Sequence, residues 1–258
     1  MLKTITLLTS YSFAAIYPLC FLISADNPLK NNFHRFHLGL PLFIGGIVVV
    51  YSGITGGFDS GIMVWSYIWI IALAIVAFYY WNKPYPNPYL VAAVCLAGMH
   101  VFGKLLTMYF QTSFWMNLIV VLGAFIFCAC IYAMNLGHFY LNVHGLPLSH
   151  LHRATYVFWI LVVVRFIVDV TALFTQNIIY AGEKIILLEF LTKMDGLFLS
   201  VAFLFGTLLP LVCLYFVHET IKLKNTQSAT GILYVILSGL LIGDMTYKYY
   251  LFKFTILL

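Results

Sequence analysis

Histidine is the residue type in this sequence of 258 residues whose number and placement first suggest chemistry. Four of the eight histidines fall within fifteen residues, in a polar segment between two apolar segments. Imidazole is the commonest ligand of transition metals, can ligate haem axially, and titrates near neutral pH. If every long apolar segment crosses a membrane, one side of that membrane holds His34, His37, His138, His144, His150, His152 and His218.

These histidines permit three interpretations, because their spacing matches no zinc motif. They are solvated interfacial side chains, ligands of a metal or haem, or contacts for a quinone or lipid headgroup. His138 and His218 end two apolar segments at similar depth, so they form the candidate haem-ligating pair. The other candidates are His144, His34 and His37 for cofactor binding, and His150 and His152 for metal binding.

Charged residues inside apolar segments form a second candidate site. Lys104, Arg165, Asp169, Asp244 and Lys248 come from three such segments. The helical rise of 1.5 Å per residue places all five about 16–27 Å from the histidine side. Ionisable residues at such depth usually face the bundle interior and mark ion paths or proton relays.

The same five residues also permit a purely structural interpretation. Arg165 precedes Asp169 by four positions, and Asp244 precedes Lys248 by four, so each pair shares one face of a helix. Two ion pairs then neutralise four of the charges. Lys104 is the surplus cation, which either meets a buried partner or extends towards the far interface.

Composition predicts the elements that must position these residues. The chain is 63% hydrophobic and 8% charged, with a mean hydropathy of +1.01, whereas soluble domains contain about 25% charged residues. Continuous apolar stretches of about 20 residues are typical of transmembrane helices. We therefore predict an all-α, polytopic integral membrane helix bundle as one domain, 1–258. Its eight predicted spans are 2–24, 37–55, 61–81, 89–110, 114–137, 154–175, 196–219 and 230–252.

The longest connection, 176–195, predicts a further element. Its segment 183–194 is mostly apolar, with Glu189 and Lys193 at helical spacing. This pattern is typical of a helix that lies in the membrane interface, or of an extension of the seventh span. Within that span, Pro210 predicts a kink.

Basic residues predict the orientation of the bundle. One side holds Lys30, Arg35, Lys83, Arg153, Lys222 and Lys224, and the other holds Lys3, Lys184, Lys193 and Lys253. The positive-inside rule then predicts that both termini are non-cytoplasmic. We expect a protein integral to a membrane, the bacterial inner membrane, surrounded by lipid and by other membrane subunits. The net charge of +5 is scattered, which argues against nucleic acid as a partner.

Two functional hypotheses from different classes follow. The first is a subunit of a membrane-bound redox complex that binds a haem, metal or quinone at the histidine side and relays protons through the buried charges. The alternative is an ion- or proton-coupled transporter of small solutes, or a scaffold subunit without a ligand. The sequence contains neither a P-loop nor a G-x-S-x-G motif, and whether the protein is an enzyme stays open.

Overall fold

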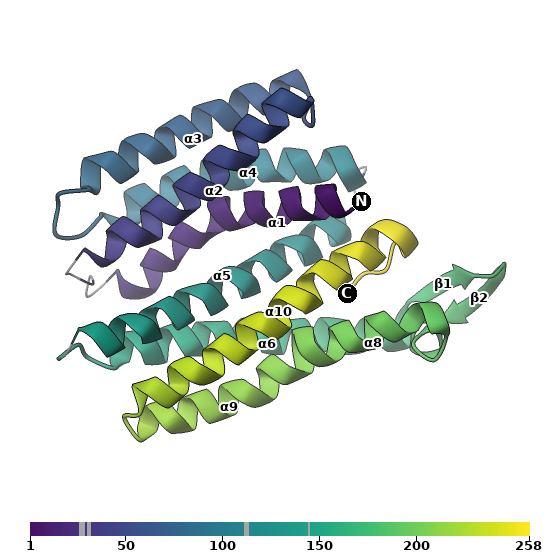
Figure 1. The fold of residues 1–258 in the computed structure, drawn as a ribbon. Coiled ribbons are helices and arrows are strands. Elements are labelled where there is room, and N and C mark those ends of the chain that lie inside the picture. The colour runs from purple at the N-terminus through teal and green to yellow at the C-terminus, as the bar shows by residue number, and fades with distance from the viewer. Residues whose placement is uncertain (26–28, 30–31, 111–113, 144) are drawn as a thin grey trace. The chain divides into compact units, whose positions relative to one another are not determined.

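The computed structural model describes residues 1–25, 29, 32–110, 114–143 and 145–258, and it confirms an all-α bundle (Figure 1). Among these residues, eight helical segments are long and apolar enough to cross a membrane. The elements are α1 (Leu2–Ile16), η1 (Tyr17–Ser24), α2 (Phe33–Thr55), α3 (Ser60–Tyr80), α4 (Pro88–Phe110), α5 (Phe114–Asn142), α6 (Ser149–Thr175), β1 (Asn177–Tyr180), β2 (Glu183–Ile186), α7 (Leu187–Phe190), η2 (Met194–Gly196), α8 (Leu197–Phe203), η3 (Leu204–Leu208), α9 (Leu209–Lys222) and α10 (Thr226–Phe254).

Several spans extend beyond the boundaries predicted from apolar residues. The second begins at Phe33 and not at residue 37, so it includes His34 as well as His37. The sixth begins at Ser149 and includes His150 and His152. Polar residues continue these helices because backbone hydrogen bonding does not require an apolar side chain, so the hydrophobic stretch marks only the part suited to the membrane core.

The chain forms two compact units, which are described separately. One unit comprises Thr6–Asn117, and the other comprises Met1–Ile5 with Leu118–Leu258. In the first, α2 packs on α3, α3 on α4, and η1 on both α2 and α4. Its core includes Tyr11, whose ring lies 5.0 Å from that of Trp69 between centroids and whose hydroxyl lies 3.2 Å from Oγ of Ser66.

The Leu118–Leu258 unit is built around α10, which packs on α8, η3 and α9, while α6 also packs on α9. Small residues allow close approach. At Gly137 of α5, an added Cβ would lie 2.5 Å from Oγ1 of Thr230 on α10. At Gly243 of α10 it would lie 2.3 Å from Cα of Gly206 in η3. Glycine is therefore required where the backbones of α10 and η3 meet, and at Gly137 it leaves room for the Thr230 side chain.

Outward-facing side chains on the helices are large and apolar. On α2, Phe43, Ile47 and Ile54 are exposed, and on α3 so is Phe78. Soluble monomers rarely expose contiguous apolar patches of this extent. The distribution agrees with helices whose outer surfaces contact lipid.

The connection 176–195 is not the predicted interfacial helix. β1 and β2 form an antiparallel hairpin that projects from the ends of α6 and α8 (Figure 1), and only Leu187–Phe190 forms a turn of α-helix. The predicted Glu189–Lys193 ion pair is present, with 3.0 Å between Oε1 and Nζ. Each strand contains two adjacent isoleucines, and β-branched residues favour strands. The apolar count alone did not separate so short a strand from a helix.

Pro210 marks an irregularity in the seventh span. A π-helical segment, η3, lies at Leu204–Leu208 between α8 and α9, while the kink itself stays a prediction. Proline has no N–H to donate to the carbonyl four residues earlier, so the backbone before it is not held in regular α-helical bonding. The irregular segment carries Thr207, a buried polar residue.

Candidate functional site

The centre of the candidate site is an ion pair buried in α6. Nε of Arg165 lies 2.8 Å from Oδ1 of Asp169, and their side chains are 5% and 0% exposed. Their spacing of four residues places both on one helix face, as the sequence predicts. An isolated charge is very costly in an apolar interior, so each of these residues depends on the other for its ionised state.

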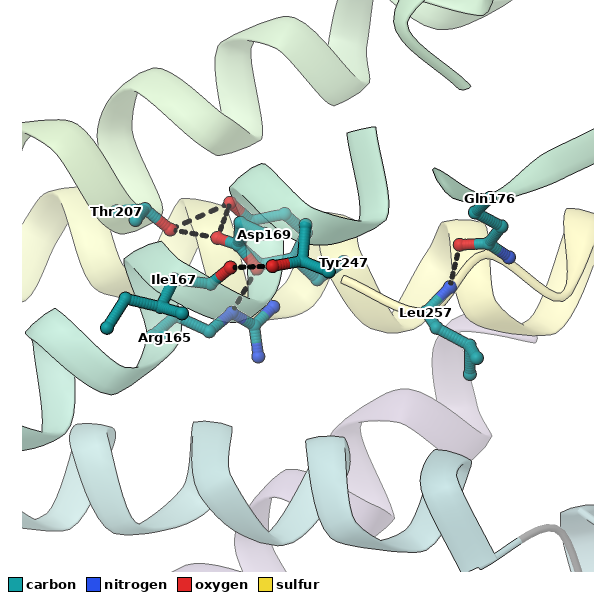
Figure 2. Close-up of polar contacts among 8 residues, drawn as sticks. Arg165, Ile167, Asp169, Gln176, Thr207, Tyr247 and Leu257 are labelled. Carbon is teal, nitrogen blue, oxygen red and sulfur yellow. Dashed lines mark hydrogen bonds and ion pairs between the residues drawn. The ribbon is translucent and has the colours of Figure 1, made fainter. Parts of the chain in front are cut away.

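Two hydroxyl groups from other helical segments complete the coordination of this carboxylate (Figure 2). Thr207 of η3 donates a hydrogen bond of 2.5 Å to Oδ2 of Asp169. Tyr247 of α10 donates one of 3.1 Å to the same oxygen, and the two hydroxyl oxygens lie 2.9 Å apart. The Tyr247 ring also lies beneath Arg165, with 4.3 Å from Cζ to the ring centroid, an attractive cation–π arrangement.

A second ion pair lies on α10, and its two members, Asp244 and Lys248, flank Tyr247 in the sequence. Lys248 donates a hydrogen bond to Oδ2 of Asp244, and their side chains are 4% and 12% exposed. A partly open pocket of about 20 Å³ is lined by one member of each pair, Arg165 and Asp244, and by Tyr247. Gly123 of α5 closes another wall, since an added Cβ there would lie 3.0 Å from Oδ1 of Asp244.

The predicted surplus cation belongs to the other unit. Lys104 on α4 is exposed, and its Nζ lies 5.6 Å from the centroid of the Trp65 ring. This placement agrees with an extended lysine side chain rather than with a buried partner. Arg165, Asp169, Asp244 and Lys248 therefore form a charge-balanced set of two cations and two anions within Leu118–Leu258.

Histidines of the same unit lie at the other end of α6. The rings of His152 and His218 are 5.8 Å apart between centroids, about 20 Å along the helix from Arg165. His150 is buried, and Nδ1 of His150 and Nε2 of His218 have no hydrogen-bond partner among the described residues. His138 is exposed at the end of α5. His152 is thus a ring neighbour of His218, and the pairing of His138 with His218 stays a prediction. His144 lies outside the described residues.

His34 and His37 occupy the start of α2 in the Thr6–Asn117 unit. Nε2 of His34 donates a hydrogen bond of 2.9 Å to the carbonyl oxygen of Tyr80. Nδ1 of His37 lies 2.6 Å from the hydroxyl of Tyr17, and the ring stacks on Phe33 with 3.9 Å between centroids. Both rings are buried. These contacts join α2 to neighbouring segments, and cofactor binding by His34 and His37 stays a prediction.

Metal binding finds little geometric support in the described parts of the chain. No group of three or more His, Cys, Asp or Glu side chains within them is arranged to hold a metal ion. The arrangement on α6, η3 and α10 is suited instead to binding and releasing a proton. It combines carboxylates, hydroxyl groups able to donate or accept, and fixed cations.

Sequence reasoning missed Thr207 and Tyr247. A threonine and a tyrosine in apolar segments are common, and neither carries a formal charge. Two signals were present: Thr207 precedes Pro210 by three positions, and Tyr247 lies between Asp244 and Lys248. Only the packing of α10 against η3 places both hydroxyl groups on one carboxylate oxygen.

Comparisons with known protein families, with characterised proteins and with solved structures find no match for this chain.

Proposed function

We propose that this protein translocates protons across a membrane, with Asp169 as the group that takes up and releases the proton. The observation that carries the proposal is a buried carboxylate held by one arginine and two hydroxyl groups from three helical segments. A stable bundle does not require such a group, because apolar residues of similar volume often stabilise as well as a buried ion pair. Ionisable residues in spans are typical of proton paths.

The chemistry of one cycle is simple. A proton added to the Asp169 carboxylate gives a neutral carboxylic acid, and Arg165, which stays protonated, loses its anionic partner. The guanidinium group then favours another hydrogen-bond acceptor. The contact between α6 and α10 weakens, because Tyr247 of α10 donates to the carboxylate of Asp169 on α6. Release of the proton restores the carboxylate and the ion pair. The two protonation states therefore favour different packing of the same helices.

Proton flux in reconstituted vesicles tests this proposal. Purified protein is placed in liposomes that contain a pH-sensitive dye, and a potassium diffusion potential drives protons inwards. We expect Asp169→Asn to lower the rate of internal acidification to that of protein-free liposomes. Glu189→Gln is the matched control, because it removes the carboxylate of an exposed ion pair of the same spacing. Equal rates for wild type and Asp169→Asn would contradict the proposal.

A second candidate function is proton translocation coupled to electron transfer, as a subunit of a membrane-bound redox complex. The observation that favours it is the His152–His218 pair, with Nε2 of His218 buried and without a hydrogen-bond partner in the described chain. Such a pair is suited to a haem, a transition metal or a quinone. In this setting the chain would lie in the bacterial inner membrane among other membrane subunits, with both termini on the non-cytoplasmic side.

Absorbance and metal content distinguish this second candidate. Protein purified with its native partners should show a haem absorption band or a stoichiometric transition metal, or should retain an extractable quinone. His218→Ala should remove that cofactor, whereas His100→Ala should not, because His100 is exposed in the other unit. Full cofactor content in His218→Ala would exclude this pair as the binding site.

A further inference from the structure

A partly open pocket, lined by one member of each buried ion pair, is large enough for one water molecule. Its volume of about 20 Å³ exceeds the about 10–15 Å³ that a single water requires. Its lining combines Arg165, Asp244 and Tyr247 with apolar residues and with Gly123 and Gly206. Polar groups on two sides of so small a space are what an internal water needs, because buried waters typically form two to four hydrogen bonds.

The guanidinium group of Arg165 gives a second, independent indication of a bound water, because one of its nitrogens lacks a hydrogen-bond acceptor in the described part of the chain. Its side chain is 5% exposed, and Nη2 has no hydrogen-bond partner among the residues that the structure describes. Figure 2 shows that the end of the guanidinium group points away from Asp169. A buried N–H of a charged group without an acceptor is costly, so an acceptor is expected beside it.

We propose that a water molecule occupies this cavity, accepts a hydrogen bond from Arg165 and donates one to Asp244, and so joins the two ion pairs into one proton path. This inference rests on the proposed function and extends it by naming Asp244 as the second proton acceptor. When a proton arrives from the Asp169–Tyr247 side, the water receives it and passes another of its hydrogens to the Asp244 carboxylate. One proton enters and one leaves, the water is regenerated, and Arg165 stays charged throughout.

Chemistry favours water over an ion at this position. A metal cation would lie beside Arg165 and close to Lys248, which repel it, and a cavity of about 20 Å³ leaves no room for its own hydration shell. An anion would be attracted by Arg165 but repelled by Asp244. Water alone is able to accept from the cation and donate to the carboxylate.

Gly123 allows the site to be removed without changing any polar group. In Gly123→Ala the added methyl would lie 3.0 Å from Oδ1 of Asp244 and 3.8 Å from Nη1 of Arg165, so it fills space on the carboxylate side. The nearest atom belongs to a side chain, which is able to move slightly, so folding should persist. Gly231→Ala on α10 is the control, because an added Cβ there meets nothing within 4 Å.

The test combines a high-resolution density map with the vesicle assay. We expect density for one water between Arg165 and Asp244 in the wild type and in Gly231→Ala, and none in Gly123→Ala. The proton flux of Gly123→Ala should fall to that of Asp169→Asn, while Gly231→Ala keeps the wild-type rate. A map that resolves other buried waters but shows none here would overturn the inference.

The outcomes separate this inference from the proposed function. If Asp169→Asn abolishes flux but Gly123→Ala, with its water gone, retains the wild-type rate, the water is not on the path and the inference fails while translocation stands. If the wild type shows no flux, the proposed function fails, and the proton path through the water fails with it. The map then still decides whether water bridges Arg165 and Asp244.

Discussion

The hydroxyl group of Tyr247 on α10 donates a hydrogen bond of 3.1 Å to Oδ2 of Asp169 on α6, across 78 positions of sequence. The ring of the same tyrosine lies beneath Arg165, the ionic partner of that aspartate. One side chain thus contacts both members of the buried pair. The protonation state of Asp169 on α6 and the position of α10 are therefore physically linked.

The first prediction concerns this hydroxyl group. Tyr247→Phe keeps the ring beneath Arg165 but leaves Asp169 with one donor fewer, so the free energy of unfolding in detergent should fall by about 1–2 kcal/mol. Tyr234→Phe on the same helix is the control, because Tyr234 is exposed and should show no loss. Similar values for the two variants would show that the Tyr247 hydroxyl does not support the charge.

The second prediction separates the ion pair from its individual charges. Asp169→Asn leaves a buried arginine without its anion and should lower the free energy of unfolding by about 3–5 kcal/mol. Arg165→Gln should also be destabilising, but the double variant should lose less than the sum of the two, because it buries no unpaired charge. Glu189→Gln in the exposed pair should cost less than about 1 kcal/mol. Additive losses for Arg165→Gln and Asp169→Asn would mean that the two side chains do not interact.

A third prediction tests the contact between α10 and η3. In Gly243→Ala the added methyl would meet the backbone of Gly206 at 2.3 Å, and overpacking of this kind costs about 1–3 kcal/mol. Moving α10 away from η3 should also lengthen the hydrogen bonds of Thr207 and Tyr247 to Asp169. Gly231→Ala, which has open space, should keep or raise the midpoint of thermal unfolding. The contact would be loose, contrary to expectation, if both alanines left that midpoint unchanged.

The fourth prediction concerns the C-terminal residues that follow α10. Nε2 of Gln176 donates a hydrogen bond of 3.1 Å to the carbonyl oxygen of Thr255, and its Oε1 accepts one of 3.0 Å from the Leu257 amide (Figure 2). Ile256 and Leu258 are buried in the adjacent apolar cluster.

Gln176→Ala should therefore increase hydrogen exchange at the Leu257 amide by about fivefold, since a neutral hydrogen bond contributes about 1 kcal/mol. Gln227→Ala is the control, because Gln227 is exposed at the start of α10. Equal exchange in both variants would indicate that burial of Ile256 and Leu258 alone holds the segment.

The sequence alone determined the class of this protein, because hydropathy is a property of local composition. Its eight apolar stretches predicted eight spans, and the four-residue spacing of Arg165–Asp169 and Asp244–Lys248 predicted both ion pairs, since residues so spaced share a helix face. Local pattern was insufficient at 183–194, where a short apolar stretch fits a strand or a helix equally well.

Tertiary structure decided which of these residues act together. Thr207 and Tyr247 reach Asp169 only because η3 interrupts the seventh span and Gly206 meets Gly243. The sequence groups Lys104 with the buried charges because of its calculated depth along its helix. In the structure, Lys104 belongs to the other unit and is exposed. Depth follows from counting residues along one helix, but proximity depends on which faces of different helices meet, and that is set by packing.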